Sequence, residues 1–284
     1  MASEKNAGRY PGGKANKRVV KYIEKDFKKQ GILHFGDSYK QDFKARLRVA
    51  KGEPEKPLVN TCNVVGYLEG NDPILKNEFI ILGAHYDHLG LGGPSSKSDK
   101  KNTIHYGADD NASGTAALLE IAEKIAVHKN ELKRSVIFIA FGAEEQGLLG
   151  SQYFVENPLV PLSQIKLMMN MDMVGRLNEQ NHIYMGGAGT FPGGEAFMQK
   201  LGESMGLTPI VHAGSVGGSD HVSFYAKALS VLGLHTGGHP QYHMPEDTVD
   251  LINIPGEKKV SEYIYTALME FATTDYKMEF IKQD

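Results

Sequence analysis

Short apolar segments alternate with amphipathic helical segments through the middle of this chain, and this alternation constrains the fold more than any other feature. Strand-like apolar runs, several of them rich in β-branched residues, cover 63–68, 79–84, 136–141, 167–173, 183–185 and 229–234, and alternating residues near 43–49 could form a further strand. Helical spacing of apolar residues covers 13–30, 113–127, 193–205 and 257–273. Continuous apolar strands that alternate with such helices indicate a sheet covered on both faces. We therefore expect a three-layer α/β/α architecture with a mixed, mostly parallel central sheet.

The chain of 284 residues contains no internal repeat and no long linker of low complexity. We expect a single domain over residues 1–284, without an inserted lid or accessory domain. Residues 1–12 are mostly polar, and we expect them to be disordered or foreign to the native chain. The segment 90–101 is rich in Gly, Ser and Lys, which predicts a mobile loop.

Composition excludes several classes of function. The chain has 31 Lys+Arg against 34 Asp+Glu, a formal charge of −3, so it lacks the basic excess typical of nucleic-acid binding. Cys62 is the only cysteine, which excludes an intrachain disulfide and a zinc site built from several thiolates. The apolar runs are far shorter than the ~20 residues of a membrane helix. The polar N-terminus lacks the apolar segment of a signal peptide.

Five segments rich in acidic residues or histidine stand mostly where a predicted strand ends. They are AHYDH (84–88), GADDNASG (107–114), FGAEEQGLLGS (141–151), MNMDMVG (169–175) and YHMPEDT (242–248). Open α/β sheets place their sites at the carboxyl ends of the strands. The sequence therefore predicts that these side chains meet in one site.

The first two segments offer ligands and supporting carboxylates. Alternation along the chain places His85 and Asp87 on one side, so Asp87 can accept from one ring nitrogen while the other binds a metal. Asp109 and Asp110 precede a helix that Asn111 could cap. Capping alone does not explain two adjacent carboxylates, which repel each other unless a cation holds them.

The other segments add further ligands. Glu144 and Glu145 follow the most apolar strand and should point in different directions, one to a metal and one to the water that it activates. Asp172 stands in an apolar run, where an unpaired carboxylate is costly. His243 is a candidate ligand and the Tyr242 hydroxyl a candidate hydrogen-bond donor. Imidazole and carboxylate ligands without thiolate suit zinc, cobalt or manganese, and five ligands match two metals that share a carboxylate.

Jointly these motifs resemble those of the M28 family of zinc metallopeptidases, close to its bacterial aminopeptidases, over about residues 63–253. The resemblance implies the zinc-dependent exopeptidase fold and two divalent ions, Zn²⁺ first among them. By position it implies that Asp109 bridges the two metals and that a cis peptide follows it at Asp109–Asp110. His85 and Asp172 would complete the ligands of one metal, and Glu145 and His243 those of the other. Asp87 and Asp110 would support these ligands.

The resemblance also implies an activity. A metal-bridged hydroxide would attack the peptide carbonyl, with Glu144 as general base and Tyr242 as a donor to the oxyanion. The expected partners are peptides with a free N-terminus, with neither nucleic acid nor a membrane span involved. Many bacterial members of the family are exported, which implies a secreted or periplasmic protein; a cytoplasmic location is the alternative.

Four alternatives remain open at this point. A glutaminyl cyclase-like enzyme would use one zinc and would not need the complete set of ligands. A carboxypeptidase would need a guanidinium for the terminal carboxylate, for which Arg176 is the nearest candidate. A metal-free binding or scaffold protein of this fold typically lacks ligands that this chain retains. A nucleotide-binding protein would want a GxGxxG turn, which the sequence lacks.

Overall fold

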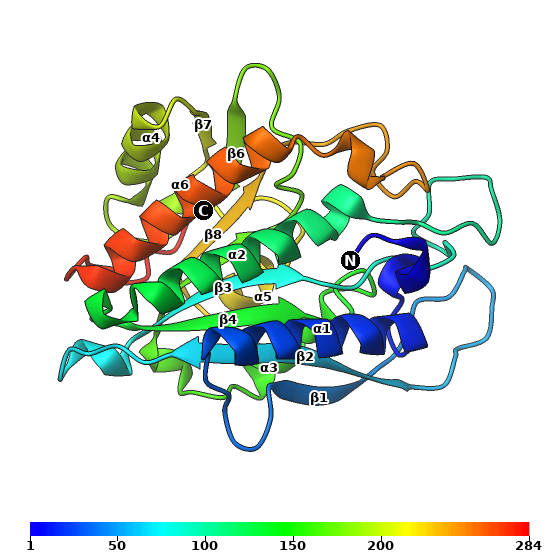
Figure 1. The fold of residues 1–284 in the computed structure, drawn as a ribbon, viewed down its shortest axis with the longest axis horizontal. Coiled ribbons are helices and arrows are strands. Elements are labelled where there is room, and N and C mark those ends of the chain that lie inside the picture. Colours follow the sequence, from blue (N-terminus) through cyan, green and yellow to red (C-terminus); the bar gives the residue numbers. More distant parts are fainter. Residues whose placement is uncertain (284) are drawn as a thin grey trace.

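The computed structural model describes residues 1–283 and contains one eight-stranded sheet in the order β1-β2-β4-β3-β5-β8-β6-β7 (Figure 1). The strands are β1 (Lys40–Ala45), β2 (Val59–Leu68), β3 (Phe79–His85), β4 (Ser135–Phe141), β5 (Ile165–Met171), β6 (His182–Gly186), β7 (Thr208–Val211) and β8 (Val231–His235). Strand β3 is parallel to both β4 and β5, β5 is parallel to β8, and β7 is parallel to β6. β1 with β2, β2 with β4, and β6 with β8 are antiparallel pairs.

Helices cover both faces of this sheet (Figure 1). They are α1 (Lys14–Gln30), α2 (Gly114–Val127), α3 (Leu149–Glu156), α4 (Gly194–Ser204), α5 (His221–Tyr225) and α6 (Ile254–Thr273). Helices α1, α2, α4 and α6 contribute side chains to one large apolar core, and α3 and α5 contribute to a second. The expected three-layer fold with a mixed, mostly parallel sheet is therefore confirmed.

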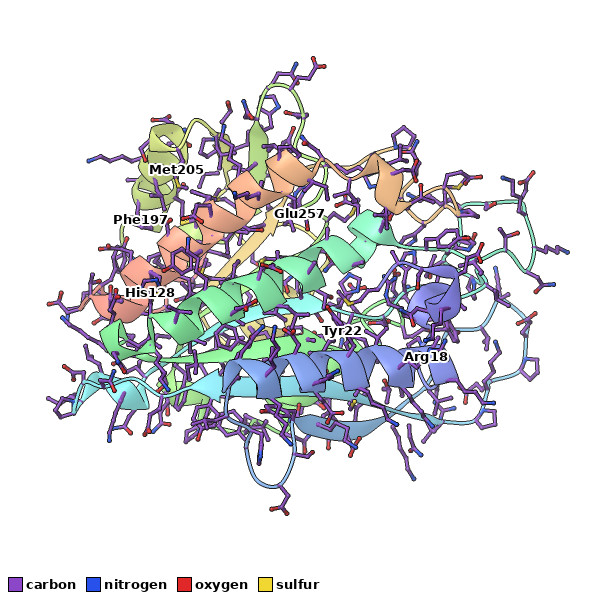
Figure 2. The ribbon with its side chains drawn as sticks, in the orientation of Figure 1. Arg18, Tyr22, His128, Phe197, Met205 and Glu257 are labelled. Carbon is purple, nitrogen blue, oxygen red and sulfur yellow. The ribbon has the colours of Figure 1, made fainter. Side chains whose placement is uncertain are left out.

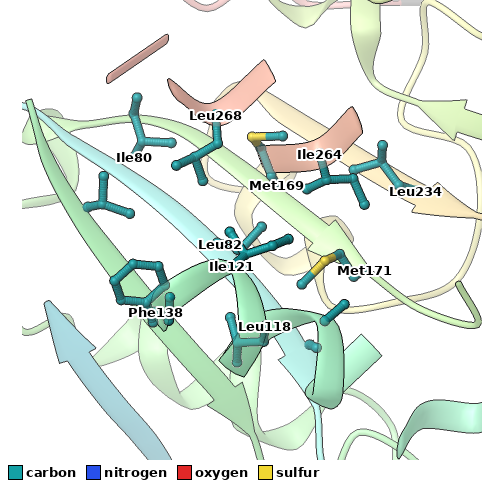
Figure 3. Close-up of a cluster of buried hydrophobic side chains, with 14 of the residues drawn as sticks. Ile80, Leu82, Leu118, Ile121, Phe138, Met169, Met171, Leu234, Ile264 and Leu268 are labelled. Carbon is teal, nitrogen blue, oxygen red and sulfur yellow. The ribbon is translucent and has the colours of Figure 1, made fainter. Parts of the chain in front are cut away.

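Strand β4 shows why the sequence folds into three layers. All seven of its residues are buried, and the alternation of side chains divides them between the two cores. Val136 and Phe138 pack into the first core, and Ile137 and Ile139 into the second. In the first core, Leu118 and Ile121 of α2 and Ile264 and Leu268 of α6 lie over the central strands (Figure 3).

Helix α1 illustrates the agreement between sequence pattern and structure. Val19, Val20, Ile23 and Phe27 are buried on one face. The helix ends at Gly31, which adopts φ 72°, a left-handed conformation that glycine enters without steric cost. The helix expected over 13–30 is therefore observed, with bounds that agree to within one residue.

Three short elements were not expected from the sequence: β7, α3 and α5. Each has at most eight residues, which is too short for a hydrophobic period to stand out. The N-terminal dozen also differs from expectation. Residues 4–9 form a 3₁₀ segment, and the Arg9 side chain is fully buried and donates to the carbonyls of Tyr86, Tyr106 and Gly107.

Strand β3 lies between β4 and β5 in the sheet. The chain therefore adds β4 on one side of β3 and then crosses over to add β5 on the other side. Such a reversal of strand order opens a crevice beyond the carboxyl ends of the strands. Within residues 1–283, every helix is too short or too polar to cross a lipid bilayer.

Candidate metal centre

Three neighbouring strands deliver acidic and histidine side chains to one edge of the sheet. His85 is the last residue of β3, Glu144 and Glu145 follow β4, and Asp172 follows β5. The turn Ala108–Ser113 before α2 brings in two further aspartates. The loop between β8 and α6 brings in His243. The segments predicted to converge therefore do so.

Two groups of ligand atoms meet around the carboxylate of Asp110. On one side, His85 Nε2 lies 3.3 Å from Asp110 Oδ1 and 3.4 Å from Asp172 Oδ1. On the other side, His243 Nε2 lies 3.2 Å from both Asp110 Oδ2 and Glu145 Oε2. Asp110 thus reaches both groups with its two oxygens, which is the arrangement of a carboxylate shared between two cations.

The structure places Asp110, and not Asp109, at this shared position, so the expected bridging residue shifts by one. The carboxylate of Asp109 is turned away: Oδ1 accepts from Gly175 N–H at 2.7 Å and from Ser113 Oγ at 3.0 Å. Its Oδ2 lies 3.2 Å from His239 Nε2. The cis peptide likewise lies at Asp110–Asn111, and not at Asp109–Asp110. Inside an irregular turn, residue spacing does not reveal which of two adjacent carboxylates faces the site.

The tautomers of the two histidines show what the groups can hold. His85 Nδ1 lies 3.3 Å from the Asp87 carbonyl, and His243 Nδ1 lies 2.8 Å from the Ser95 carbonyl. A carbonyl only accepts hydrogen bonds, so both Nδ1 atoms carry the proton in the neutral rings. Each Nε2 then presents a lone pair to carboxylate oxygens. A nitrogen lone pair and a carboxylate oxygen repel each other at this distance unless a cation lies between them.

The electrostatics of the cluster agree with this demand for positive charge. Burial lowers the pKa of His243, but the nearby carboxylates of Asp110 and Glu145 outweigh this effect and raise the pKa to about 10. Asp110 Oδ2 and Asp172 Oδ1 are buried and accept no regular hydrogen bond from residues 1–283. Buried carboxylate oxygens without donors are costly, and metal ligation removes that cost. The nitrogen and oxygen donors fit zinc or a similar divalent ion.

His88 belongs to the second group, a position that was not predicted from the sequence. Its ring is fully buried, and Nδ1 lies 2.7 Å from Glu145 Oε1. Glu145 is therefore held through one oxygen by His88 while its other oxygen faces His243. The HYDH motif contains the signal, since His88 follows His85 by three residues at the end of the same strand.

Asp87 supports a different neighbour from the one expected. Its Oδ1 lies 3.9 Å from His85 Nδ1, beyond hydrogen-bond distance. The same oxygen accepts the backbone N–H of Glu144 at 2.9 Å. Asp87 thereby fixes the turn that carries Glu144, while its backbone carbonyl faces His85.

Glu144 and Glu145 face different histidines, as predicted for neighbours at a strand end. Glu144 Oε2 lies 4.0 Å from His85 Nε2, and its side chain is 13% exposed. Burial raises the pKa of Glu144 well above its usual range, and Glu145, Asp220 and Asp172 raise it further against the opposing effect of His85. A carboxylate with a raised pKa can take up and hold a proton.

Tyr242 stacks on His243, with ring centroids 3.9 Å apart, and Lys97 Nζ lies 4.1 Å from the Tyr242 ring centroid. Lys97 belongs to the segment 90–101, whose backbone also contacts the His243 loop, because Lys97 N–H donates to the His243 carbonyl. Burial and the nearby carboxylates raise the pKa of Tyr242, so its hydroxyl remains a donor.

The guanidinium group of Arg176 is hydrogen-bonded to side chains of the protein itself. Its Nη2 donates to Asp247 Oδ1 at 2.8 Å, and its Nη1 donates to Gln241 Oε1 at 2.8 Å. The Asp247 side chain is fully buried, so this ion pair is part of the loop structure. The arrangement disfavours Arg176 as the anchor of a carboxypeptidase.

A cavity of about 300 Å³ opens beside these groups. Its lining includes Asp110, Glu144, Asp172, Tyr242 and His243. Residues of the glycine-rich segment 217–221 also line it. The cavity therefore places a small ligand against the shared carboxylate and Glu144.

The model of peptidase family M28 matches residues 63–268, most of the chain and all of the segments described above. The chain belongs to peptidase family M28. Leucine aminopeptidase 2 of Arthroderma otae is 29% identical over 245 residues, which cover 76% of this chain and 45% of that protein. Aminopeptidase YwaD of Bacillus subtilis is 28% identical over 238 residues, which cover 78% of this chain and 47% of that protein. The chain thus spans about half the length of these curated relatives.

Several solved structures share the fold of this chain. The glutaminyl cyclase of Porphyromonas gingivalis superposes with a TM-score of 0.75 at 20% identity, covering 94% of both chains. BSAP, a zinc aminopeptidase from Bacillus subtilis, superposes with a TM-score of 0.74 at 18% identity, covering 100% of this chain and 96% of the other. At this identity the likeness establishes the fold alone.

Proposed function

We propose that this protein is a metallo-exopeptidase that removes the N-terminal residue from peptides with a free α-amine. The observation that carries the proposal is the position of Asp110, whose two oxygens face His85 and His243 separately. With Asp172 on one side and Glu145 on the other, this arrangement supports two divalent ions, Zn²⁺ first among them. Family membership supports a peptidase, and the names of the curated relatives support an aminopeptidase.

Five residues would hold the metals in this proposal. His85, Asp110 and Asp172 form one set, and His243, Asp110 and Glu145 form the other, with His88 holding Glu145 in place. When bound there, divalent ions supply Lewis acidity, which makes water more acidic and polarises a peptide carbonyl.

Glu144 is the proposed general base. It lines the cavity beside Asp110 and Asp172, and its raised pKa suits a group that takes a proton from water and returns it to the leaving amine. The hydrogen bond from its backbone N–H to Asp87 fixes its position. Tyr242, whose hydroxyl stays protonated, is the proposed donor to the oxyanion of the tetrahedral intermediate.

The free α-amine requires an acidic group that a substrate can reach. Asp172 lines the cavity, and its side chain is 23% exposed. The side chains of Asp110 and Glu145 are only 4% and 3% exposed. We therefore assign the recognition of the α-amine to Asp172, which would restrict cleavage to the first residue of a peptide.

Hydrolysis of aminoacyl-anilides and of their N-acetylated forms tests the proposal. Each substrate is offered to the purified protein, to the protein stripped by a chelator, and to the stripped protein after addition of zinc. We expect cleavage of the free-amine substrates alone, lost with the chelator and restored by zinc. Glu144→Gln, loaded with metal, is the matched inactive control.

Two results would overturn the proposal. Cleavage of the N-acetylated substrates would exclude dependence on a free amine. Absence of cleavage in protein that binds about two metals per chain would exclude an aminopeptidase. A peptide with N-terminal glutamine belongs in the panel, because its cyclisation without hydrolysis would assign the activity of a glutaminyl cyclase.

A further inference from the structure

The cavity beside Glu144 and Asp172 is lined by apolar side chains, here called its walls, and by a group of polar side chains, here called its floor. Val216 and Leu234 contribute to the walls, while Asn170, Ser219 and His221 contribute polar side chains. The side chains of Asn170 and His221 are buried, with exposed fractions of 1% and 3%. Each of them carries an atom without a hydrogen-bond partner among residues 1–283.

Asn170 stands two residues before Asp172 along β5, so the two side chains lie on the same face of the sheet. Asn170 therefore lies one step deeper in the cavity than the carboxylate assigned to the α-amine. Its Nδ2 donates to Ser219 Oγ at 2.8 Å. Its Oδ1 accepts no hydrogen bond from the described residues and is a free acceptor.

His221 provides a second acceptor. Its Nε2 lies 3.1 Å from the Val216 carbonyl, which can only accept, so Nε2 carries the proton. Burial lowers the pKa of His221, and the ring stays neutral at pH 7. Nδ1 therefore offers a lone pair, and it has no partner in the part of the chain that the structure describes.

The two acceptors are neighbours across the sheet. Gly233 of β8 pairs in register with Asn170 of β5, and the His221 ring lies directly over Gly233. A Cβ atom at position 233 would come within 2.6 Å of this ring, so glycine is required for His221 to reach the floor. The structure thus places the Asn170 side chain on β5 and the His221 ring over the neighbouring strand β8, and neither acceptor has a donor among residues 1–283.

A buried acceptor without a partner destabilises the protein, and a ligand that donates to it removes this cost. We propose that the cavity receives the side chain of the substrate's first residue and that its floor selects side chains that end in an N–H or O–H donor. Asparagine and lysine belong to this class. Leucine and norleucine lack the donor, and aspartate presents further negative oxygens to the acceptors. The proposal rests on the exopeptidase function proposed above.

The test compares side chains of matched shape. Asparaginyl-, leucyl- and aspartyl-anilides have similar volumes and differ in their terminal atoms; lysyl- and norleucyl-anilides differ by the ammonium group. For the zinc-loaded protein we expect kcat/KM at least about tenfold higher for asparaginyl than for leucyl or aspartyl substrate. The same preference should hold for lysyl over norleucyl substrate.

Two variants test whether the floor residues cause the preference for asparaginyl substrate. Asn170→Leu replaces the acceptor with an apolar group of similar shape, and the ratio of asparaginyl to leucyl kcat/KM should fall below one. Val216→Ala changes an apolar wall and should leave that ratio within about threefold of its original value. A wild-type protein that prefers leucyl to asparaginyl substrate would overturn the proposal.

A binding measurement separates this proposal from the proposed function. Calorimetric titration of the zinc-loaded protein with asparaginamide, leucinamide and aspartic acid α-amide needs no turnover. Preferential binding of asparaginamide by a protein that hydrolyses nothing would support selection of the side chain by the floor residues and would contradict the proposed exopeptidase function. Equal binding of asparaginamide and leucinamide would mean that water satisfies the two acceptors, and the floor would then have no role in selection.

Discussion

The buried carboxylate of Asp247 accepts the backbone N–H of Asp110 through Oδ2 at 3.0 Å. The same oxygen accepts the N–H of Asp109 at 3.0 Å, and the Asp247 carbonyl accepts the N–H of Ala108. Asp247 follows His243 by four residues. One side chain therefore ties the loop that carries a candidate ligand to the turn that carries the shared carboxylate, and Arg176 completes its hydrogen bonds.

We expect Asp110 and Asp109 to respond differently to the loss of a carboxylate. Asp110→Asn should lower the number of zinc ions bound per chain, because both groups lose an oxygen. Asp109→Asn should keep the metal content and lower the thermal midpoint, because Asp109 bonds to Gly175 and Ser113. Elemental analysis and thermal unfolding measure the two effects. The reverse pattern would restore Asp109 as the bridging residue.

Removal of the His88 donor should weaken metal binding without removing a ligand of the proposed set. His88→Leu leaves Glu145 Oε1 without its hydrogen bond, and loss of such support typically lowers metal affinity 10- to 100-fold. His88→Asn can place an amide N–H near the position of Nδ1 and should retain part of the affinity. Competition with a chromogenic chelator measures both variants. Equal affinities in His88→Leu and wild type would exclude this role.

Glu144→Gln should separate catalysis from metal binding. The amide cannot take a proton from water, and loss of a general base typically costs at least 10²–10⁴-fold in rate. The metal content should stay unchanged, because Glu144 is absent from both proposed ligand sets. Steady-state kinetics and elemental analysis on the same preparation provide the check. A variant that retains a tenth of the wild-type kcat would require another base.

Arg176→Met should reduce stability by about 1–3 kcal/mol, because the buried Asp247 carboxylate loses its guanidinium partner. Chemical denaturation measures this loss. The preference between a peptide and its C-terminal amide should not change, since Arg176 is already bonded to Asp247 and Gln241. If the variant selectively lost activity toward the free carboxylate, the carboxypeptidase alternative would return.

We expect the stability of the protein to depend on pH through the carboxyl group of Glu257. This residue lies in the first turn of α6 (Figure 2), and burial, with a contribution from Asp109, raises its pKa to about 7. A carboxyl group with a raised folded-state pKa favours folding at low pH, and this contribution is lost as the pH rises from about 4.5 to 7. Glu257→Gln should therefore stabilise the protein by about 1–3 kcal/mol at pH 8.

The advantage of Glu257→Gln should shrink toward pH 5, where the wild-type carboxyl is protonated. Thermal unfolding between pH 5 and 8 measures the difference. Glu195→Gln is the matched control, because Glu195 is an exposed acid in the first turn of α4, and its effect should stay small at every pH. A constant difference between wild type and Glu257→Gln would contradict the raised pKa.

Local pattern determined much of this structure. The run of six apolar residues in β4, from Val136 to Phe141, is typical of a strand buried on both faces, which indicated the three layers. Gly31 marked the end of α1. The placement of His85, Glu145 and Asp172 after strand ends followed from the rule that sites form at the carboxyl edge of the sheet.

Only the tertiary structure decided which atoms face each other. Asp109 and Asp110 are adjacent in an irregular turn, where no periodicity applies, and hydrogen bonds from Gly175 and Ser113 turn the first carboxylate away. His88 acquires its role from Glu145, 57 residues further along the chain. Sequence alone determined the residue types and the edge of the sheet where they gather, because both follow from local pattern. Packing between distant segments decided the partner of each side chain, because such contacts leave no periodic trace in the sequence.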